Sequence, residues 1–190
     1  MQVEEAILTR RTHKTYDGSE VRDEELRALI SAATWAPNHR HTEPWRFAVI
    51  RGRSRETFAD VIDTALNSMR KPDGEADQKI TAKKKKFRRR LQEAAALVLV
   101  TYVRSRDDDL LDREDYAATA CAIQNLQLAA TGRGLVCLWS TSGVFKHDVV
   151  RHFAGWNEDE ELVGAVFIGR PKGELQGRRT KSVEDIARWL

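Results

Sequence analysis

The chain has 190 residues, of which 41% are hydrophobic and 32% are charged. This length and apolar content favour a single globular domain over residues 1–190, because no linker or internal repeat divides the chain. The formal charge is only +3, and seven of the cations lie in the run Lys83–Arg90, so the rest of the chain is slightly acidic. A generally cationic surface built for nucleic acid is therefore excluded.

Several features of the sequence predict a cytoplasmic, soluble protein. Cys121 and Cys137 are the only cysteines, which are too few for a disulfide framework and fit a reducing compartment. Glu4 and Glu5 stand where a signal peptide would carry cations. The longest uncharged segment, residues 116–132, contains three side-chain amides and is shorter than the ~20 apolar residues that a membrane span needs.

The first half of the chain shows alternating helix and strand patterns. The pattern predicts helices over Val3–Thr9 and Asp23–Thr34, a strand over Trp45–Ile50 and a helix through Phe58 and Ala65. We expect Asp23 to cap the second helix and Pro37 to end it. Its apolar stripe consists of Leu26, Leu29, Ile30 and Ala33.

The second half continues the alternation and indicates an α+β fold. We expect a turn or loop over Asn67–Gly74, an exposed helix or mobile excursion over Glu75–Glu93, a buried strand over Ala94–Val103, a helix over Asp112–Thr131, a strand over Leu135–Trp139, a short helix over Lys146–Phe153, a core strand over Leu162–Gly169 and a short helical pattern over Val183–Trp189. Apolar or small residues cover nearly the whole circumference of Asp112–Thr131, so we expect this helix to be buried on most sides.

Three common kinds of catalytic or binding motif find little support. His39 and His41 lie two residues apart, but no carboxylate or cysteine stands at ligand spacing and Arg40 would repel a cation, so we expect loop histidines and no metal. No Gly-x-Ser-x-Gly nucleophile motif is present. Gly132–Gly134 is a fragment of a dinucleotide fingerprint that follows a helix instead of a strand, which favours a helix C-cap.

The segment Arg10–Lys14 is suited to binding phosphate. Arg10 and Arg11 offer forked donors to phosphate oxygens, Thr12 adds a hydroxyl, and Lys14 can meet a second negative centre farther along a ligand. On this pentapeptide alone, a solvated basic turn is the alternative.

Four motifs occur together in a characteristic order. They are Arg10–Lys14; Trp35–His39 followed by Pro44–Phe47; Ala122–Ala130, with the core Gln-Asn-Leu-Gln-Leu-Ala-Ala; and Gly134–Trp139. In this order and spacing they resemble the nitroreductase-like flavoprotein family, and the resemblance extends to Gly169–Pro171 and Val183–Trp189 near the C-terminus. It covers residues from about 4 to 189.

The resemblance implies an α+β nitroreductase-like fold, in which helices surround a central mixed, mostly antiparallel sheet. It implies an intertwined homodimer with FMN at the subunit interface. The implied activity is that of an NAD(P)H oxidoreductase, with NADH or NADPH reducing the flavin and a nitroaromatic, quinone or similar small molecule then accepting the electrons by a ping-pong mechanism. Because the flavin carries the chemistry, no protein residue is assigned as catalytic.

The resemblance also implies roles for individual residues. Arg10, Arg11 and Thr12 match positions around the FMN phosphate, and Lys14 matches a basic position near the pyrimidine edge of the flavin. His39 matches a position that reaches FMN from the partner subunit. The segment Trp139, Ser140 and Thr141 matches the stretch beside the isoalloxazine, and Arg179 with Lys181 matches a C-terminal pair of cations near the phosphate, where Arg178 is an alternative to Arg179. Substrate choice is expected to depend on loops over the flavin, within Met69–Lys86.

The run Lys83–Arg90 supports an alternative from another class, a module that binds nucleic acid or an acidic partner. Phe87 is the only aromatic residue in the run, and no base-stacking platform accompanies it. We therefore expect no nucleic acid partner, and favour a solvated helix face or a mobile loop at the edge of the active site.

Overall fold

The structure is a computed structural model that describes residues 1–69 and 74–190, with side chains in the second range described from residue 78 onward. The loop predicted for Asn67–Gly74 is only partly tested, because residues 70–73 lie outside the described residues. Asn67 and Ser68 belong to the preceding helix and Gly74 begins the next one, so the prediction of a loop is wrong for these three residues.

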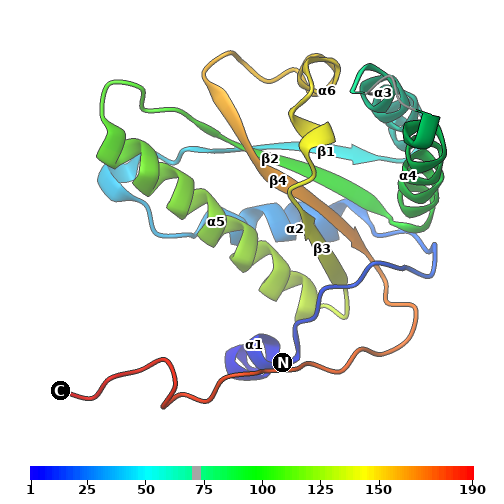
Figure 1. Cartoon of the computed structure of the whole chain (residues 1–190). Coiled ribbons are helices and arrows are strands. Elements are labelled where there is room, and N and C mark those ends of the chain that lie inside the picture. Colours follow the sequence, from blue (N-terminus) through cyan, green and yellow to red (C-terminus); the bar gives the residue numbers. More distant parts are fainter. Residues whose placement is uncertain (70–73) are drawn as a thin grey trace.

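Four strands form one antiparallel sheet at the centre of the fold (Figure 1). They are β1 (Trp45–Arg51), β2 (Ala96–Val103), β3 (Val136–Ser140) and β4 (Glu160–Gly169), in the order β1-β2-β4-β3. All three strand pairings are antiparallel. Among the described residues, the only parallel contact is an isolated bridge between Thr12 and Cys137. The sheet was predicted to be mixed and mostly antiparallel, and this bridge is its one parallel element among the described residues.

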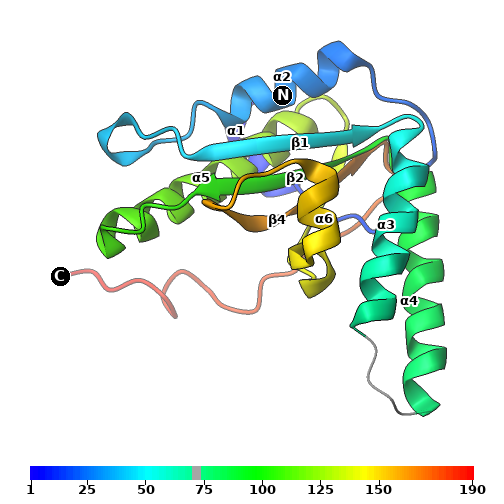
Figure 2. The same ribbon diagram turned by 90° about the horizontal axis from the view of Figure 1, so that it is seen from above.

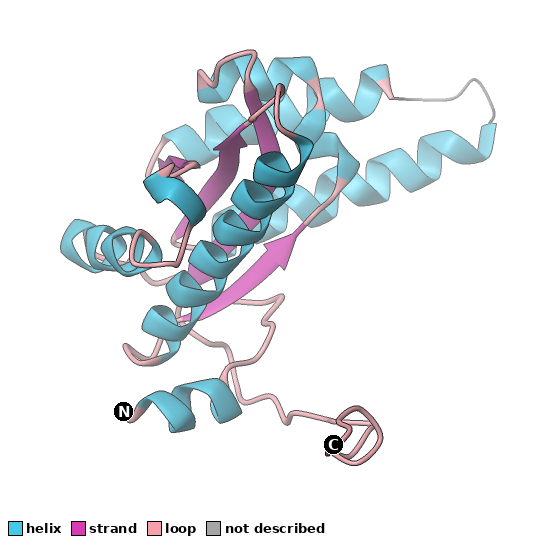
Figure 3. Ribbon diagram, turned by 90° about the vertical axis from the view of Figure 1, so that its left-hand side faces the viewer, coloured by secondary structure: helices cyan, strands magenta, loops and turns pink. Residues whose placement is uncertain are grey.

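Helices cover both faces of the sheet. They are α1 (Val3–Thr9), α2 (Asp23–Ala33), α3 (Ser54–Ser68), α4 (Gly74–Glu93), α5 (Asp109–Thr131) and α6 (Asp148–Ala154), with short 3₁₀ turns η1 (His39–His41) and η2 (Gly143–Lys146). Val98 and Val100 of β2 point into the apolar cluster shared with α2 and α5, and Leu97 and Leu99 point into the cluster shared with α3 and α6. Figure 3 shows α5 lying across one face. The predicted α+β architecture is confirmed.

Two local predictions are wrong. Asp23 does not cap α2; the carboxylate of Glu25 accepts a hydrogen bond from the Arg22 backbone N–H at 3.1 Å, while Asp23 forms an ion pair with Arg51 of β1. The segment Val183–Trp189 forms no helix, only a turn in which the Ala187 N–H donates to the Val183 carbonyl. A single turn outside the core gains no packing energy that would extend it into a helix.

Helix α5 is buried on one face instead of on most sides. Ala118, Ala122 and Leu126 are buried against α2 and the sheet. The opposite face leaves exposed Tyr116, Ala117, Cys121 and Gln124. Apolar and small residues around a helix indicate contact on every side, but the described residues of one chain pack against only one side of α5.

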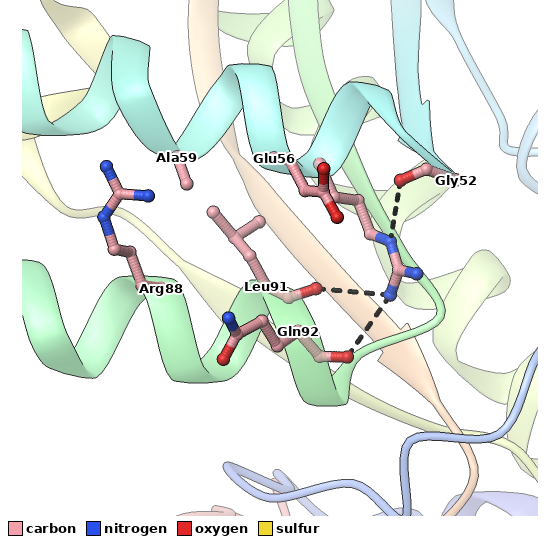
Figure 4. A pocket seen from close by; sticks show the side chains of 7 residues that line it. Gly52, Glu56, Ala59, Arg88, Leu91 and Gln92 are labelled. Carbon is pink, nitrogen blue, oxygen red and sulfur yellow. Dashed lines mark hydrogen bonds between the residues drawn. The ribbon is translucent and has the colours of Figure 1, made fainter.

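Helices α3 and α4 lie side by side as an antiparallel pair that projects beyond the sheet (Figure 2). Arg55 joins them where α4 ends: its Nη1 donates to the carbonyl oxygens of Leu91, at 3.2 Å, and Ala94. These contacts satisfy carbonyl groups that the end of a helix leaves without partners. A cavity of about 180 Å³ lies between the two helices at this point. Figure 4 shows this cavity from close by. Arg55 is one of its lining residues and holds the two helices together.

The basic run on α4 is partly built into this packing. Arg88 donates to Asp60 at 2.6 Å and to Asp63 at 2.9 Å, both on α3. Arg90 is buried, with its guanidinium 5.2 Å from the centre of the Phe167 ring, and its burial lowers the pKa of the group. The expectation of a fully solvated face is therefore wrong for these two arginines.

None of the helices that the structure describes is long and apolar enough to cross a membrane.

Exchanging Arg88 and an exposed lysine for glutamine separates packing from surface charge. Arg88→Gln removes two charged hydrogen bonds and leaves Asp63 without its cation, so we expect a loss of about 1 kcal/mol of stability, a decrease of roughly 2–4 °C in Tm. Lys85→Gln removes the same charge from an exposed position, and its Tm should stay within about 1 °C. Thermal unfolding of both variants checks this; equal shifts would contradict it.

Candidate functional site

The N-terminal basic segment is held along the start of β3. After α1 ends at Thr9, the chain runs beside this edge strand, where Thr12 forms its bridge to Cys137 and the His13 N–H donates to the Cys137 carbonyl at 3.0 Å. Buried Tyr16 anchors the far end of the segment, with its hydroxyl donating to the His13 carbonyl at 3.1 Å. Arg10 and Thr12 therefore have a fixed place at the edge of the sheet, and Lys14 is exposed just beyond.

Arg11 joins this segment to the C-terminal tail, whose course past α1 is seen in Figure 1. Its Nη1 donates to the carbonyl oxygens of Leu8, at 2.7 Å, and Arg10, at 2.8 Å. A Cβ atom placed on Gly177 would lie 2.3 to 2.5 Å from three atoms of the Arg11 guanidinium, so the tail passes directly against this group and a side chain at position 177 would have to displace it. The contact brings the chain segment that carries Arg178 and Arg179 to the N-terminal arginines.

Arg11 also has a buried N–H group that donates no hydrogen bond to the described residues. Its Nε is buried and has no hydrogen-bond partner among the described residues. A buried unsatisfied donor is costly, and in native structures such groups call for an explanation such as a missing ligand or water. The tail on either side of this point is exposed, Arg179 and Lys181 included, and Arg179 follows Gly177 by two residues along the chain.

The segment Trp139, Ser140 and Thr141 lies at the other end of the same strand. Ser140 pairs with Ala165 of β4 and ends β3, and Thr141 is exposed immediately after it. Trp139 is partly buried against the cluster beneath α2 and α5. Ser140 is three positions after Cys137, which corresponds to roughly 10 Å along a strand. The structure therefore brings both predicted groups of residues to one edge strand.

His39 lies far from these residues within the chain. It belongs to η1, where its Nδ1 is 3.9 Å from the Glu114 carboxylate and the neighbouring Thr42 hydroxyl donates to Asp115 at 2.5 Å. Both acidic residues are in the first turns of α5, a 23-residue helix about 35 Å long, whereas Thr12 contacts the strand that follows its other end. One chain does not bring His39 to the cations.

The loop that carries His39 has an unusual backbone. Arg40, His41 and Glu43 are all in the left-handed region, with φ of 52°, 53° and 43°. Each such residue costs of order 1 kcal/mol or more, and backbone strain of this kind clusters at binding sites. The Asn38 side chain supports the loop by accepting the Glu43 N–H at 3.1 Å. This strain, which the sequence did not indicate, marks the loop as a second part of the candidate site.

The titratable groups beside the cations do not favour acid–base or thiol chemistry. Burial raises the pKa of Cys137 to about 12, although nearby Arg10 opposes the shift. Burial also lowers the pKa of His13, which keeps its imidazole neutral at neutral pH. Among the described residues, no three His, Cys, Asp or Glu side chains are grouped so that they could hold a metal ion. The arrangement is suited to holding an anion.

Two glycines of the site were missed by sequence reasoning. Gly177 is the seat of Arg11, and Gly164 lies beneath the indole of Trp139. An isolated glycine within the apolar run Leu162–Gly169 is a signal of close backbone approach that was available in the sequence.

This chain is similar to known proteins both in sequence and in fold. The nitroreductase family model matches residues 7–170. A solved nitroreductase-like family protein from Bacillus cereus has a TM-score of 0.84 at 25% identity, covering 100% of this chain and 96% of that chain.

Two further relatives add names and a ligand. Chloronitrobenzene nitroreductase of Comamonas testosteroni is 26% identical over 201 residues, 88% of this chain and 86% of its own. A nitroreductase from Bacteroides fragilis, solved with bound FMN, has a TM-score of 0.77 at 23% identity and covers 100% of both chains. The match of the family model over most of the residues, together with the common fold, establishes that the chain belongs to the nitroreductase family.

Proposed function

We propose that this protein is an FMN-dependent NAD(P)H oxidoreductase of the nitroreductase type, with residues 1–190 forming one domain. Its electrons would pass to nitroaromatic, quinone or similar small-molecule acceptors. The observation that carries the proposal is the contact of Arg11 with Gly177, which gathers cations from both ends of the chain beside a buried donor that has no partner among the described residues.

These residues fit the phosphate of FMN. Arg10 and Arg11 provide forked donors, and the Thr12 hydroxyl is exposed beside them. The tail adds Arg179, and Lys181 follows two residues later. Phosphate oxygens would supply the acceptor that the Arg11 Nε lacks, so the ligand would remove a cost that the protein alone carries.

The other end of β3 fits the flavin ring. Trp139, Ser140 and Thr141 are proposed to lie beside it, and Lys14 near its pyrimidine edge. Bound FMN would accept and donate a hydride, and a reduced flavin carries negative charge at that edge, so an ammonium group there stabilises the reduced form and raises the reduction potential. The raised pKa of Cys137 and the lowered pKa of His13 support a protein whose part is binding and electrostatics.

We propose an intertwined homodimer with FMN at the subunit interface. His39 lies beside the first turns of α5, at the end of this helix that is remote from the cations of the same chain, so a second copy would supply it. The exposed face of α5, with Ala117 and Cys121, is available to a partner. So is the groove of about 450 Å³ between α2 and the edge strand β1, lined by Leu26, Ile30, Phe47 and Val49. The tail leaves Ile186 and Trp189 exposed at 71% and 84%, apolar groups that such a groove would cover.

Binding of FMN is the first test. The purified protein should be yellow, and Arg10→Ala should weaken FMN binding roughly 10- to 100-fold, the equivalent of one charged hydrogen bond. Arg53→Ala, which removes an exposed arginine at the start of α3, should bind FMN like wild type. Titration of the apoprotein with FMN measures all three. Wild-type protein that fails to bind added FMN would refute the proposed function.

The kinetic mechanism gives a second test. We propose that NAD(P)H leaves before the acceptor enters the same space, so anaerobic initial velocities at several acceptor concentrations should give parallel double-reciprocal lines. Intersecting lines would show that both substrates bind together. Running the assay with NADH and with NADPH identifies the preferred donor.

A further inference from the structure

Trp139 lies across the neighbouring strand on a residue that has no side chain. A Cβ atom placed on Gly164 would be 2.0 Å from the indole Nε1 and 2.6 Å from Cδ1 of Trp139, and 3.2 Å from the carbonyl oxygen of Ser140. The first two distances are shorter than any real contact, and the atoms belong to a bulky ring in the apolar cluster beneath α2 and α5. Any other residue at position 164 would displace the indole.

A glycine in this place is otherwise unfavourable. Gly164 lies in the middle of β4, between Val163 and Ala165, where both faces are buried. Glycine in a strand interior loses more backbone entropy than other residues and contributes no packing. Its presence is explained by the indole that lies on it.

The indole itself carries a cost. The Trp139 Nε1 is buried and has no hydrogen-bond partner among the described residues. A leucine or phenylalanine would fill the same cluster without an unsatisfied N–H. Packing alone therefore does not account for tryptophan here. Directly after Trp139, β3 ends at Ser140 and the exposed Thr141 begins the loop that the proposed function places at the flavin ring.

We propose that Gly164 is a positioning residue for the flavin site: it lets the indole of Trp139 lie across β4, and the indole in this position fixes the direction in which Ser140 and Thr141 leave the sheet. The inference rests on the proposed function. A Cβ atom at position 164 would meet both the ring and the Ser140 carbonyl, so a side chain there would push on the segment at two points.

The opposite edge of the sheet offers a control for lost stability. Ile50 is buried on β1, the edge strand farthest from β3 in the order β1-β2-β4-β3, and its side chain packs in the cluster shared with α3 and α6. Ile50→Ala removes buried apolar volume and should therefore lower Tm. It should do so without reaching the flavin ring, because no residue assigned to the flavin lies on β1.

The experiment compares Gly164→Ala, Ile50→Ala, Trp139→Ala and the double variant Trp139→Ala/Gly164→Ala as full-length proteins with FMN. We expect Gly164→Ala to change the visible absorption spectrum and reduction potential of bound FMN and to lower kcat roughly 10- to 100-fold with little change in the KM for NAD(P)H. Ile50→Ala should keep the wild-type spectrum and potential. With Trp139 already removed, adding Gly164→Ala should leave both unchanged.

Two outcomes would overturn the inference: flavin properties in Gly164→Ala that match those in Ile50→Ala, or a further change when Gly164→Ala is added to Trp139→Ala. Tm provides a test that does not need FMN, because the destabilisation by Gly164→Ala should largely vanish in the Trp139→Ala background. If Gly164→Ala alone does not fold, the double variant should fold, and its failure would contradict the seating of the indole. Failure of the wild-type protein to bind FMN would refute the proposed function. The Tm comparison would still test whether Gly164 makes room for the indole of Trp139.

Discussion

The pairing of β2 with β4 is the interaction on which the rest of the structure depends. From Ala96 to Val100 every residue of β2 is fully buried, and β4 is buried from Leu162 to Gly169. Strands that are apolar on both faces must be covered on both sides, which explains why α2 and α5 pack on one face and α3, α4 and α6 near the other. The outer strands then remain as edges, and the candidate site is built on one of them, β3.

At that edge the two ends of the chain meet. The segment from Arg10 to Tyr16 docks on β3, and the tail after β4 crosses it so that Gly177 lies against Arg11. The positive charges are therefore unevenly distributed over the fold, although the net charge is only +3. Arg88 and Arg90 of the basic run pack against α3 and Phe167, whereas Arg10, Arg11 and Lys14 lie beside β3, where we propose that an anion binds. Cations that look alike in the sequence therefore have different surroundings in the fold.

The sequence predicted most of the fold, because alternating and helical apolar patterns report directly on which side chains are buried. Its errors have a common cause. The apolar circumference of α5 was interpreted as burial within the chain, although periodicity does not identify which molecule covers a face. Asp23 was assigned as a cap because its residue type favours that position, but its ion pair with Arg51 depends on a strand more than twenty residues away.

The candidate site was predicted unevenly for a related reason. The order of the motifs identified Arg10, Arg11 and Trp139, but the glycines that seat two of these side chains depend on contacts between distant segments. The positive φ angles of Arg40 and Glu43 could not be predicted either, because these residue types do not favour positive φ. Residue identity predicts what a site contains, while close approaches between backbone and side chain determine how it is held.

The proposed function requires the cations beside β3 to recognise the phosphate of a flavin. This recognition can be measured by comparing the affinities of the apoprotein for FMN and for riboflavin, which lacks the phosphate. Two or more charged hydrogen bonds to phosphate predict that FMN binds at least roughly 100-fold more tightly at low salt, with the ratio falling as ionic strength rises. Equal affinities for the two flavins at low salt would show that the phosphate is not recognised.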